Sequence, residues 1–488
     1  MVRDGRNAKE FDPDRLRRAL RQLTQFSLVI HNDKTDAYSI HPLVHKWARE
    51  RPDMSILEQG VWSEAAAVLL SSCILLPPLG NTTDEEQVRK YLLPHVEFVS
   101  KRQQEIEQRM RDIRMARMKP WPLFEGGFNK EKTLMYAKFS LIYAHNGQWE
   151  EAKRLQRTVR NVTLQFLGLE HASTRRITLA LSGTLHALGE TDDSAELRSE
   201  IHEACNAFLG EQHHETLTAK TMLGESRHTQ GRHTESKDLL EEAATGLKKL
   251  FGIYHPDTLN AIDYLGRTLS IFYTKESISR ARELHQQAVE GMRIVHGRHH
   301  LRTLEACENL CSTAVRSGDV GHLQEAKEMM EEVLKVRKEH LGKEHGFTLL
   351  SMVNLSSVRS GLGDLVGAEE LLQSALEVGE RDLGRDHQAC LWGRYLLGKI
   401  WLKREEWAKA EPYIIDVTSR QMRMLQGRGR YHPDRLGGLV DLATVYNALG
   451  KTEDRDRVAH EALEGFEKIN GSRHPVASGL REDMNAWR

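Results

Sequence analysis

The sequence predicts an all-α fold, a right-handed superhelix (α-solenoid) of about eight stacked helix pairs, with a small winged-helix-like module at the N-terminus. The main observation is a Gly followed three residues later by a His. This pair recurs at intervals of 42 or 45 residues, and we call its histidines the anchor histidines: His171, His213, His255, His300, His345, His387, His432 and His474. A period in this range is typical of stacked supersecondary units rather than of one globular core.

A second periodic feature is a Leu followed by a small residue. Counting starts at a reference residue, three positions after each anchor histidine. Seven positions further on stands a Leu, and the next residue is always small: Ser182, Gly224, Gly266, Cys311, Ser356, Gly398 and Ala443. A turn with Gly then leads into a second helix that has small residues at matching positions. Small side chains let two antiparallel helices approach closely, and Gly supplies the turn between them.

Length and composition exclude several classes of protein. The 488 residues exceed the usual size of a single hydrophobic core. The net charge of −1, with 28% charged residues, creates no overall electrostatic field that would attract nucleic acid or a membrane surface. The five cysteines are too few for a disulfide framework. The most apolar run, residues 65–78, is too short to span a membrane. We therefore expect a cytoplasmic protein with no membrane partner.

Residues 1–55 predict a helix, a hairpin and a second helix. Asp12-Pro13-Asp14 is a helix start, and apolar residues follow at helical spacing up to Phe26. Residues 27–31 and 37–41 are two short β-rich runs separated by a polar turn. A second helix over 43–50 follows Pro42. This order of elements is typical of a winged helix.

The stretch from Tyr38 to Val44 (Tyr-Ser-Ile-His-Pro-Leu-Val) resembles the winged-helix portion of signal-transduction ATPases with an NB-ARC-type nucleotide domain, especially fungal NLR-like proteins with C-terminal repeats. That class has a Met-His-Asp-Leu-like motif whose His contacts the phosphates of bound ADP. The resemblance implies this role for His41, within a parent protein that has the nucleotide domain. Ile40 takes the Met place, and Pro42 departs from the motif where Asp would stand. Alternatively, His41 ends a strand and caps the next helix.

A phosphate-binding loop is not found in the sequence. Gly393 to Lys399 has the spacing, but Ile400 stands where a hydroxyl must reach Mg²⁺. Gly450-Lys451-Thr452 matches the last three residues of the phosphate-binding motif, but Val445 occupies the position of its first Gly. The sequence thus indicates the C-terminal half of such a regulator without its nucleotide-binding domain, and it predicts no cofactor for this chain.

Three further regions complete the expected organisation. Residues 56–128 form a connector with helices near 62–76 and 85–118, ended by Pro120-Trp121-Pro122. Residues 129–474 form the repeats, and residues 475–488 a capping helix.

The repeats resemble the tetratricopeptide repeat, in which the Leu–small pair and the small residues of the second helix hold the same places. The 42-residue unit with His255-Pro-Asp-Thr-Leu259 resembles the kinesin light chain type. The resemblance implies a concave groove lined by positions two, five, six and nine after the reference residue. In three copies these are Asn260, Asp263, Tyr264, Arg267, Glu305, Glu308, Asn309, Ser312, Leu350, Val353, Asn354 and Ser357.

Asn309 and Asn354 fall where kinesin light chain repeats place asparagines that hydrogen-bond an extended peptide. An amide both donates and accepts, as a peptide backbone requires. The alternative is that both face solvent or a neighbouring helix.

Catalytic and metal sites are not indicated. Cys307 and Cys311 lie one helical turn apart at packing positions, and no second ligand pair has metal spacing. His213-His214-Glu215 lacks the second His of a metalloprotease helix. We predict neither metal nor enzymatic activity.

Three functions remain open. The first is a non-enzymatic protein–protein interaction scaffold, the sensor end of an NB-ARC regulator. The second is a free-standing, kinesin light chain-like adaptor that binds extended peptides. The third, which the acidic residues near Asp12 oppose, is a winged-helix nucleic-acid binder using a basic helix at Arg15 to Arg21.

Overall fold

The computed structural model describes residues 29–32, 37–40, 54–74, 83–116, 129–424, 433–470 and 475–487. The chain divides into two compact units, one of residues 1–66 with 99–120, the other of residues 67–98 with 121–488. Two of its three boundaries fall inside helices, α3 (Ile56–Ser72) and α4 (Thr83–Ala116). The predicted division into a winged helix over 1–55 and a connector over 56–128 therefore stays a prediction.

The first unit contains the predicted hairpin. Strands β1 (Val29–Asn32) and β2 (Ala37–Ile40) pair antiparallel, with Val29 opposite Ile40. The helices expected on either side, and His41 itself, lie outside the described residues. Helix α3 begins at a reciprocal cap, because the Ser55 hydroxyl accepts from the backbone N–H of Glu58 and the Glu58 carboxylate accepts from that of Ser55.

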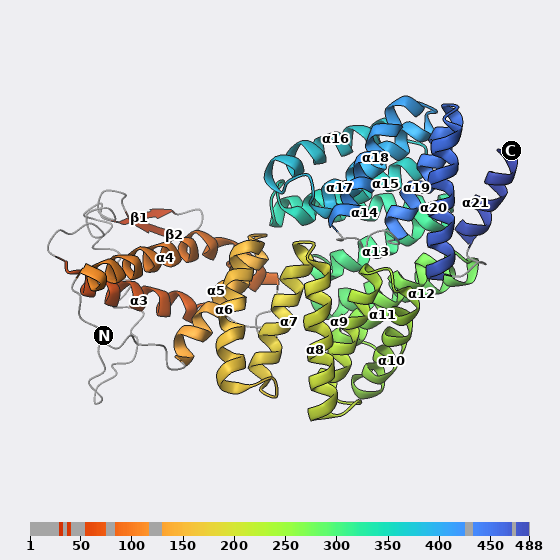
Figure 1. Cartoon of the computed structure of the whole chain (residues 1–488). Helices are drawn as coiled ribbons and strands as arrows, with labels where there is room; N and C mark the ends of the chain where they lie inside the picture. The colour runs from red at the N-terminus through yellow and green to blue at the C-terminus, as the bar shows by residue number, and fades with distance from the viewer. Residues whose placement is uncertain are drawn as a thin grey trace. The chain divides into compact units, whose positions relative to one another are not determined.

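The second unit contains eight antiparallel helix pairs within the described ranges (Figure 1). We call the first helix of each pair helix A and the second helix B. The pairs are α5 (Lys130–His145) with α6 (Trp149–Leu167), α7 (Ala172–Ala187) with α8 (Thr191–Leu209), α9 (His214–Thr229) with α10 (His233–Phe251), α11 (Pro256–Leu269) with α12 (Lys275–His296), α13 (Leu301–Ser317) with α14 (Val320–His340), α15 (Gly346–Gly361) with α16 (Leu365–Asp382), α17 (Gln388–Lys403) with α18 (Trp407–Met424), and α19 (Pro433–Ala448) with α20 (Thr452–Asn470). A short 3₁₀ turn, η1 (Ser270–Phe272), extends α11, and α21 (Pro475–Ala486) packs on α20. The predicted α-solenoid is confirmed.

The Gly-x-x-His spacing forms the joint between one repeat and the next. Gly252 has a φ of +81°, and its N–H donates to the carbonyl of Lys248 to end α10. The His255 imidazole then begins α11, because its Nδ1 accepts from the backbone N–H of Asp257 at 3.3 Å. Five other anchor histidines make the same cap: His171, His213, His300, His345 and His387. The six anchor histidines within the described residues are therefore helix N-caps.

At three of the joints the reference residue adds a hydrogen bond on the other side of the turn. The hydroxyls of Thr216, Thr303 and Thr348 each donate, at 2.8 Å, to the carbonyl of the Gly that ended the previous helix. A buried carbonyl at a helix end would otherwise lack a partner. Gly, His and Thr at intervals of three thus satisfy both helix ends of one turn.

The Leu–small pair sets the distance between the helices of a pair. A Cβ added to Gly224 on α9 would lie 2.7 Å from Cγ of Leu240 on α10, closer than real contacts allow. At the same crossing, the Ser236 hydroxyl donates to the Gly224 carbonyl at 2.7 Å. Ser194 makes the equivalent bond to Ser182 in the preceding repeat. The small residues are therefore required by direct backbone approach.

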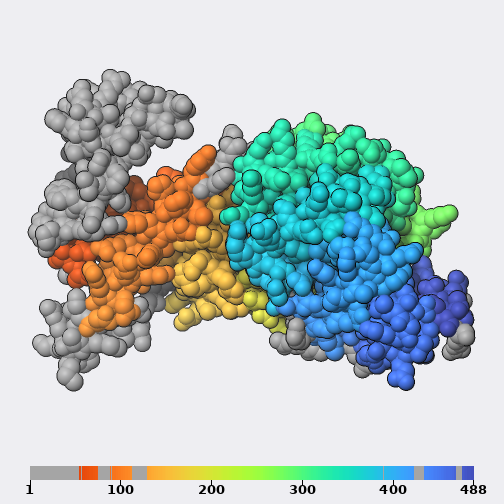
Figure 2. All heavy atoms as spheres, turned by 90° about the horizontal axis from the view of Figure 1, so that it is seen from above, coloured from red at the N-terminus to blue at the C-terminus, as the bar shows by residue number. Residues whose placement is uncertain are grey.

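Curvature follows from unequal contact on the two sides of the stack. Each helix A from α9 to α19 contacts the next helix A, whereas the described B helices have no comparable contact with one another. The A helices therefore line the concave side. Buried residues such as Leu217, Leu259 and Leu304 belong to one core that runs through several repeats. Figure 2 shows the side chains of the later repeats forming a continuous surface.

Candidate functional site

The candidate site is the inner face, which we define as the positions two, five, six and nine after the reference residue on each helix A. These positions lie on the concave side because the A helices approach one another there. The face differs between the third to fifth repeats, where its charges are buried in ion pairs, and the sixth to eighth, where several side chains are available.

A buried ion-pair network occupies the inner face at α9 and α11. Glu225 lies 2.7 Å from Arg198 of α8 and 3.4 Å from Arg267 of α11. Arg198 is 2% exposed and also donates to the Ser226 hydroxyl and the Met222 carbonyl. Burial alone would raise the pKa of Glu225, but the neighbouring positive charges hold it well below its usual range. Glu225 is therefore a fixed anion with its charge already compensated.

A second buried cluster joins α11, α12 and α13. One oxygen of Asp263 lies 2.8 Å from Nδ1 of His285, and the other accepts from Asn309 at 2.8 Å. Tyr264 accepts from Arg302, which also pairs with Glu305. Asp263 and Tyr264 are buried. The structure thus brings together four of the predicted groove residues, Asp263, Tyr264, Glu305 and Asn309, and it uses them to connect neighbouring repeats.

A third cluster continues into α15. Glu308 lies 2.8 Å from Arg337 of α14 and accepts from the Ser351 hydroxyl at 2.7 Å. Glu308 is buried. It therefore has no surface to offer a partner while this network is intact.

The sixth repeat, by contrast, presents free polar groups. Leu350, Asn354 and Ser357 are half-buried on α15. The side chains of Asn354 and Ser357 form no hydrogen bond with any other described residue, nor does Asn260 on α11. Of the two asparagines expected to bind a peptide, Asn309 is engaged by Asp263 and Asn354 is available.

The seventh and eighth repeats add residues that the sequence reasoning did not single out. Trp392 is 37% exposed, and its ring lies 5.4 Å from that of Tyr395. Tyr395 and Lys399 both bond Asp441 of α19, at 2.6 and 2.8 Å. These four residues occupy positions two, five and nine after Cys390 and six after Arg435, so the same counting would have found them.

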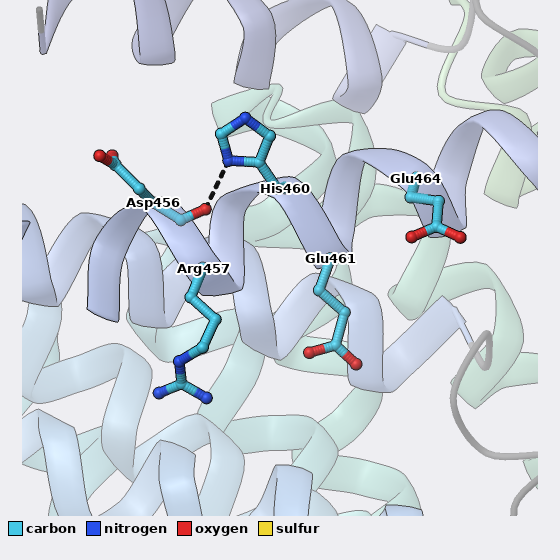
Figure 3. A pocket seen from close by; sticks show the side chains of 5 residues that line it. All are labelled: Asp456, Arg457, His460, Glu461 and Glu464. Carbon is cyan, nitrogen blue, oxygen red and sulfur yellow. Dashed lines mark hydrogen bonds between the residues drawn. The ribbon is translucent and has the colours of Figure 1, made fainter. Parts of the chain in front are cut away.

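Other candidate sites offer no reactive centre. Cys307 and Cys311 lie in the hydrophobic core, and burial raises the pKa of Cys307 to about 11. The described residues contain no group of His, Cys, Asp and Glu that would hold a metal. A shallow hollow of about 480 Å³ is lined by α20 alone, through Asp456, Arg457, His460, Glu461 and Glu464. Figure 3 shows these side chains spread along one helix, without convergence.

The repeats match known family models over a large part of the array. A tetratricopeptide repeat model matches residues 181–249, and a second one matches residues 314–346, 348–389 and 436–476. This chain contains tetratricopeptide repeats. Neither matched model describes a catalytic family. None of the described helices combines the length and apolar character needed to cross a bilayer.

Several solved structures are similar to the chain. A putative kinesin light chain from Podosopora anserina with nearly identical TPR-like repeats is 23% identical over 44% of this chain and 98% of that one, with a TM-score of 0.32. The apo quorum sensor NprR from B. thuringiensis is 15% identical over 73% and 99%, with a TM-score of 0.41. A STAND protein with a tetratricopeptide repeat sensor from Pyrococcus horikoshii is 13% identical over 96% and 60%, with a TM-score of 0.39. Among curated proteins, none matches the chain.

Proposed function

We propose that this chain is a non-enzymatic scaffold that binds an extended peptide, or an extended segment of a protein, on the inner face of the sixth to eighth repeats. The observation behind this proposal is the contrast along the inner face. Asn354, Ser357 and Trp392 are accessible, and the two polar ones have no internal hydrogen bond. Buried charges of the third to fifth repeats are already paired with each other.

The chemistry of this surface suits a peptide backbone beside an apolar or aromatic side chain. Asn354 can donate and accept, as a peptide unit requires. Trp392 offers a broad apolar face, and aromatic anchors contribute most of the binding energy in many interfaces. Lys399 is about one-third exposed beside it and would accommodate a carboxylate.

A display selection with the full chain would test this function. Random dodecamer peptides would be selected for binding, and their affinities compared between the native chain and Asn354→Ala and Trp392→Ala. We expect each substitution to weaken binding by about tenfold or more, as hot-spot residues do. Asn206→Ala, at an exposed position on helix B of the second repeat, is the matched control. Selected peptides that bind all variants equally would place the site elsewhere.

A regulatory role within a larger NB-ARC-type system is a second proposal. It is supported by the hairpin, whose strand β2 ends at Ile40, immediately before the His41 of the motif that resembles those regulators. Sequencing of transcripts upstream of Met1 would test it. An in-frame domain with a phosphate-binding loop supports the sensor role, whereas a stop codon directly upstream favours the free-standing adaptor. The free cysteines are consistent with the cytoplasmic location that we propose.

A further inference from the structure

Two turns that are far apart in the sequence meet within the second unit. The turn between α5 and α6 contains Gly147, and the joint between α14 and α15 contains His345. A Cβ added to Gly147 would lie 3.2 Å from Nε2 of the His345 ring. Beside this contact, the rings of Trp149 and Phe347 lie edge to face, with centroids 6.0 Å apart. We call these four residues the seam.

The seam joins the first repeat to the start of the sixth. Because these two repeats are far apart along the array, their contact closes one complete turn of the coil. Figures 1 and 2 both show the orange and yellow helices of the first repeat beside the teal helices that begin the sixth. The inner face of the intervening repeats is thereby enclosed at this point.

The two aromatic residues of the seam differ from those at the same positions in most other copies. Position two after the anchor histidine holds Ser173, Glu215, Asp257, Arg302 and Ala389 in other copies, and Phe only at Phe347. Helix B begins with Thr191, His233, Val320 and Leu365 in other repeats, and with Trp at Trp149 and Trp407. Two large aromatic residues thus stand at the two turns that meet.

The seam is also thin. Phe347 remains 39% exposed, and Gly147 has no side chain. Nε2 of His345 is buried, and no described residue lies within normal hydrogen-bond distance and angle of it. Nδ1 of the same ring already accepts the hydrogen bond that caps α15. A contact of so few groups is readily lost in a local opening, because solenoid repeats flex through many small adjustments.

We propose that the seam is a latch, which holds one turn of the array shut and opens to let a partner bound on the sixth to eighth repeats reach the inner face of the repeats before them. The inference rests on the proposed binding function. Its structural part can be tested without any ligand, so failure of the latch and failure of the binding function are distinguishable.

Hydrogen exchange on the full chain tests whether the seam forms. Trp149→Ala should speed exchange of the amides of residues 346–349, far along the chain, by about two- to tenfold, the factor that one aromatic pair contributes. Phe347→Ala should do the same for residues 145–150. The control is Trp407→Ala, which removes a Trp at the same helix position that forms no ring contact with another aromatic residue among those described. Changes confined to the substituted repeat, as expected for the control, would overturn the proposal.

A second measurement tests whether the seam controls access. Asn260→Cys places a thiol on the inner face, in a chain where the exposed Cys73 is replaced by Ser. Its reaction rates with N-ethylmaleimide and with a 5-kDa polyethylene glycol maleimide are compared, with and without Trp149→Ala. Opening should speed the bulky reagent severalfold and leave the small reagent unchanged. An equal ratio of the two rates in both backgrounds would show that the seam is no barrier.

Discussion

Nη1 of Arg198 lies 2.7 Å from a carboxylate oxygen of Glu225, and these two buried side chains come from helices of adjacent repeats. Each repeat supplies one half of the pair, so the buried charge of Arg198 is compensated only when the two repeats stack in register. Because of this pair, the second repeat stacks on the third through a specific ionic contact in addition to apolar packing.

Glu225→Gln leaves the buried guanidinium of Arg198 without its counter-ion. We expect the free energy of unfolding, measured by urea titration, to fall by about 3–5 kcal/mol. The double variant Arg198→Met, Glu225→Met should recover most of this loss, because two apolar side chains of similar size avoid the desolvation cost of an unpaired charge. Arg154→Met, which breaks an exposed pair with Glu151, should change stability by less than about 1 kcal/mol. Equal effects at the two sites would contradict this account.

Gly224→Ala should destabilise the third repeat by about 1–3 kcal/mol, since the new methyl group would overlap the Leu240 side chain and push the two helices apart. Gly183→Ala is the matched control in the preceding helix A, where a Cβ meets no atom within 4 Å. There the same change should stabilise by up to about 1 kcal/mol, because alanine favours a helix more than glycine does. Thermal and urea unfolding of both variants would check the opposite signs.

The caps at His345 and His387 should make stability depend on pH. An Nδ1 that accepts a hydrogen bond cannot also hold a proton. Burial, with the nearby charge of Arg337, lowers the pKa of His345 to about 4, and burial also lowers that of His387. Between the ordinary value of 6.5 and about 4, the unfolded chain binds more protons than the folded one. Stability is therefore complete above about pH 6.5 and is lost progressively as the pH falls through this window.

The pH effect can be assigned to the cap by substitution. His345→Asn keeps a side-chain acceptor at the N-cap but removes the titrating group. We expect it to flatten the fall in the free energy of unfolding between pH 7 and pH 5. His460→Asn, on the exposed surface of α20, should leave the slope unchanged. An unchanged slope in His345→Asn would assign the pH dependence to other groups.

The thiols should differ in reactivity by location. Cys73 is exposed, whereas Cys205, Cys307, Cys311 and Cys390 are buried. Burial raises the pKa of Cys307 and Cys390 to about 11, so their reactive thiolate forms are scarce. A disulfide reagent such as DTNB should titrate one thiol in the native chain and five after unfolding. Rapid reaction of more than one thiol before unfolding would show that the repeats open more easily than their packing indicates.

The periodic features predicted the fold well because each has a local cause. Gly252 requires a positive φ, and Gly224 allows a close helix crossing, so spacing alone reveals both. The capping role of the anchor histidines was not foreseen, since Ser, Thr, Asp and Asn are the usual N-caps. The spacing of the histidines identified them as part of the repeat, but only the structure shows that their Nδ1 atoms accept a backbone hydrogen bond.

The inner face was harder to predict, because counting positions along one helix does not reveal what the neighbouring helices supply. Asp263 and Glu308 occupy positions expected to line a groove, yet His285 and Arg337 reach them from adjacent B helices. Whether a charged side chain on helix A is free to bind a peptide depends on whether a residue of a B helix, such as His285 or Arg337, already pairs with it. Asn309 and Asn354 hold equivalent positions, and only the first is taken by a carboxylate.

The Gly–His–Thr joint has an evolutionary consequence. Its hydrogen bonds are made by backbone groups and two side chains, His and Thr, that recur in several repeats, so two units cut and rejoined there would find the same connection. Recombination at these joints would add or remove a whole unit without disturbing the crossing inside any pair. We would expect relatives to differ in length by multiples of one unit, and the ion pairs between particular neighbours, such as Arg198 and Glu225, to restrict which units can be exchanged.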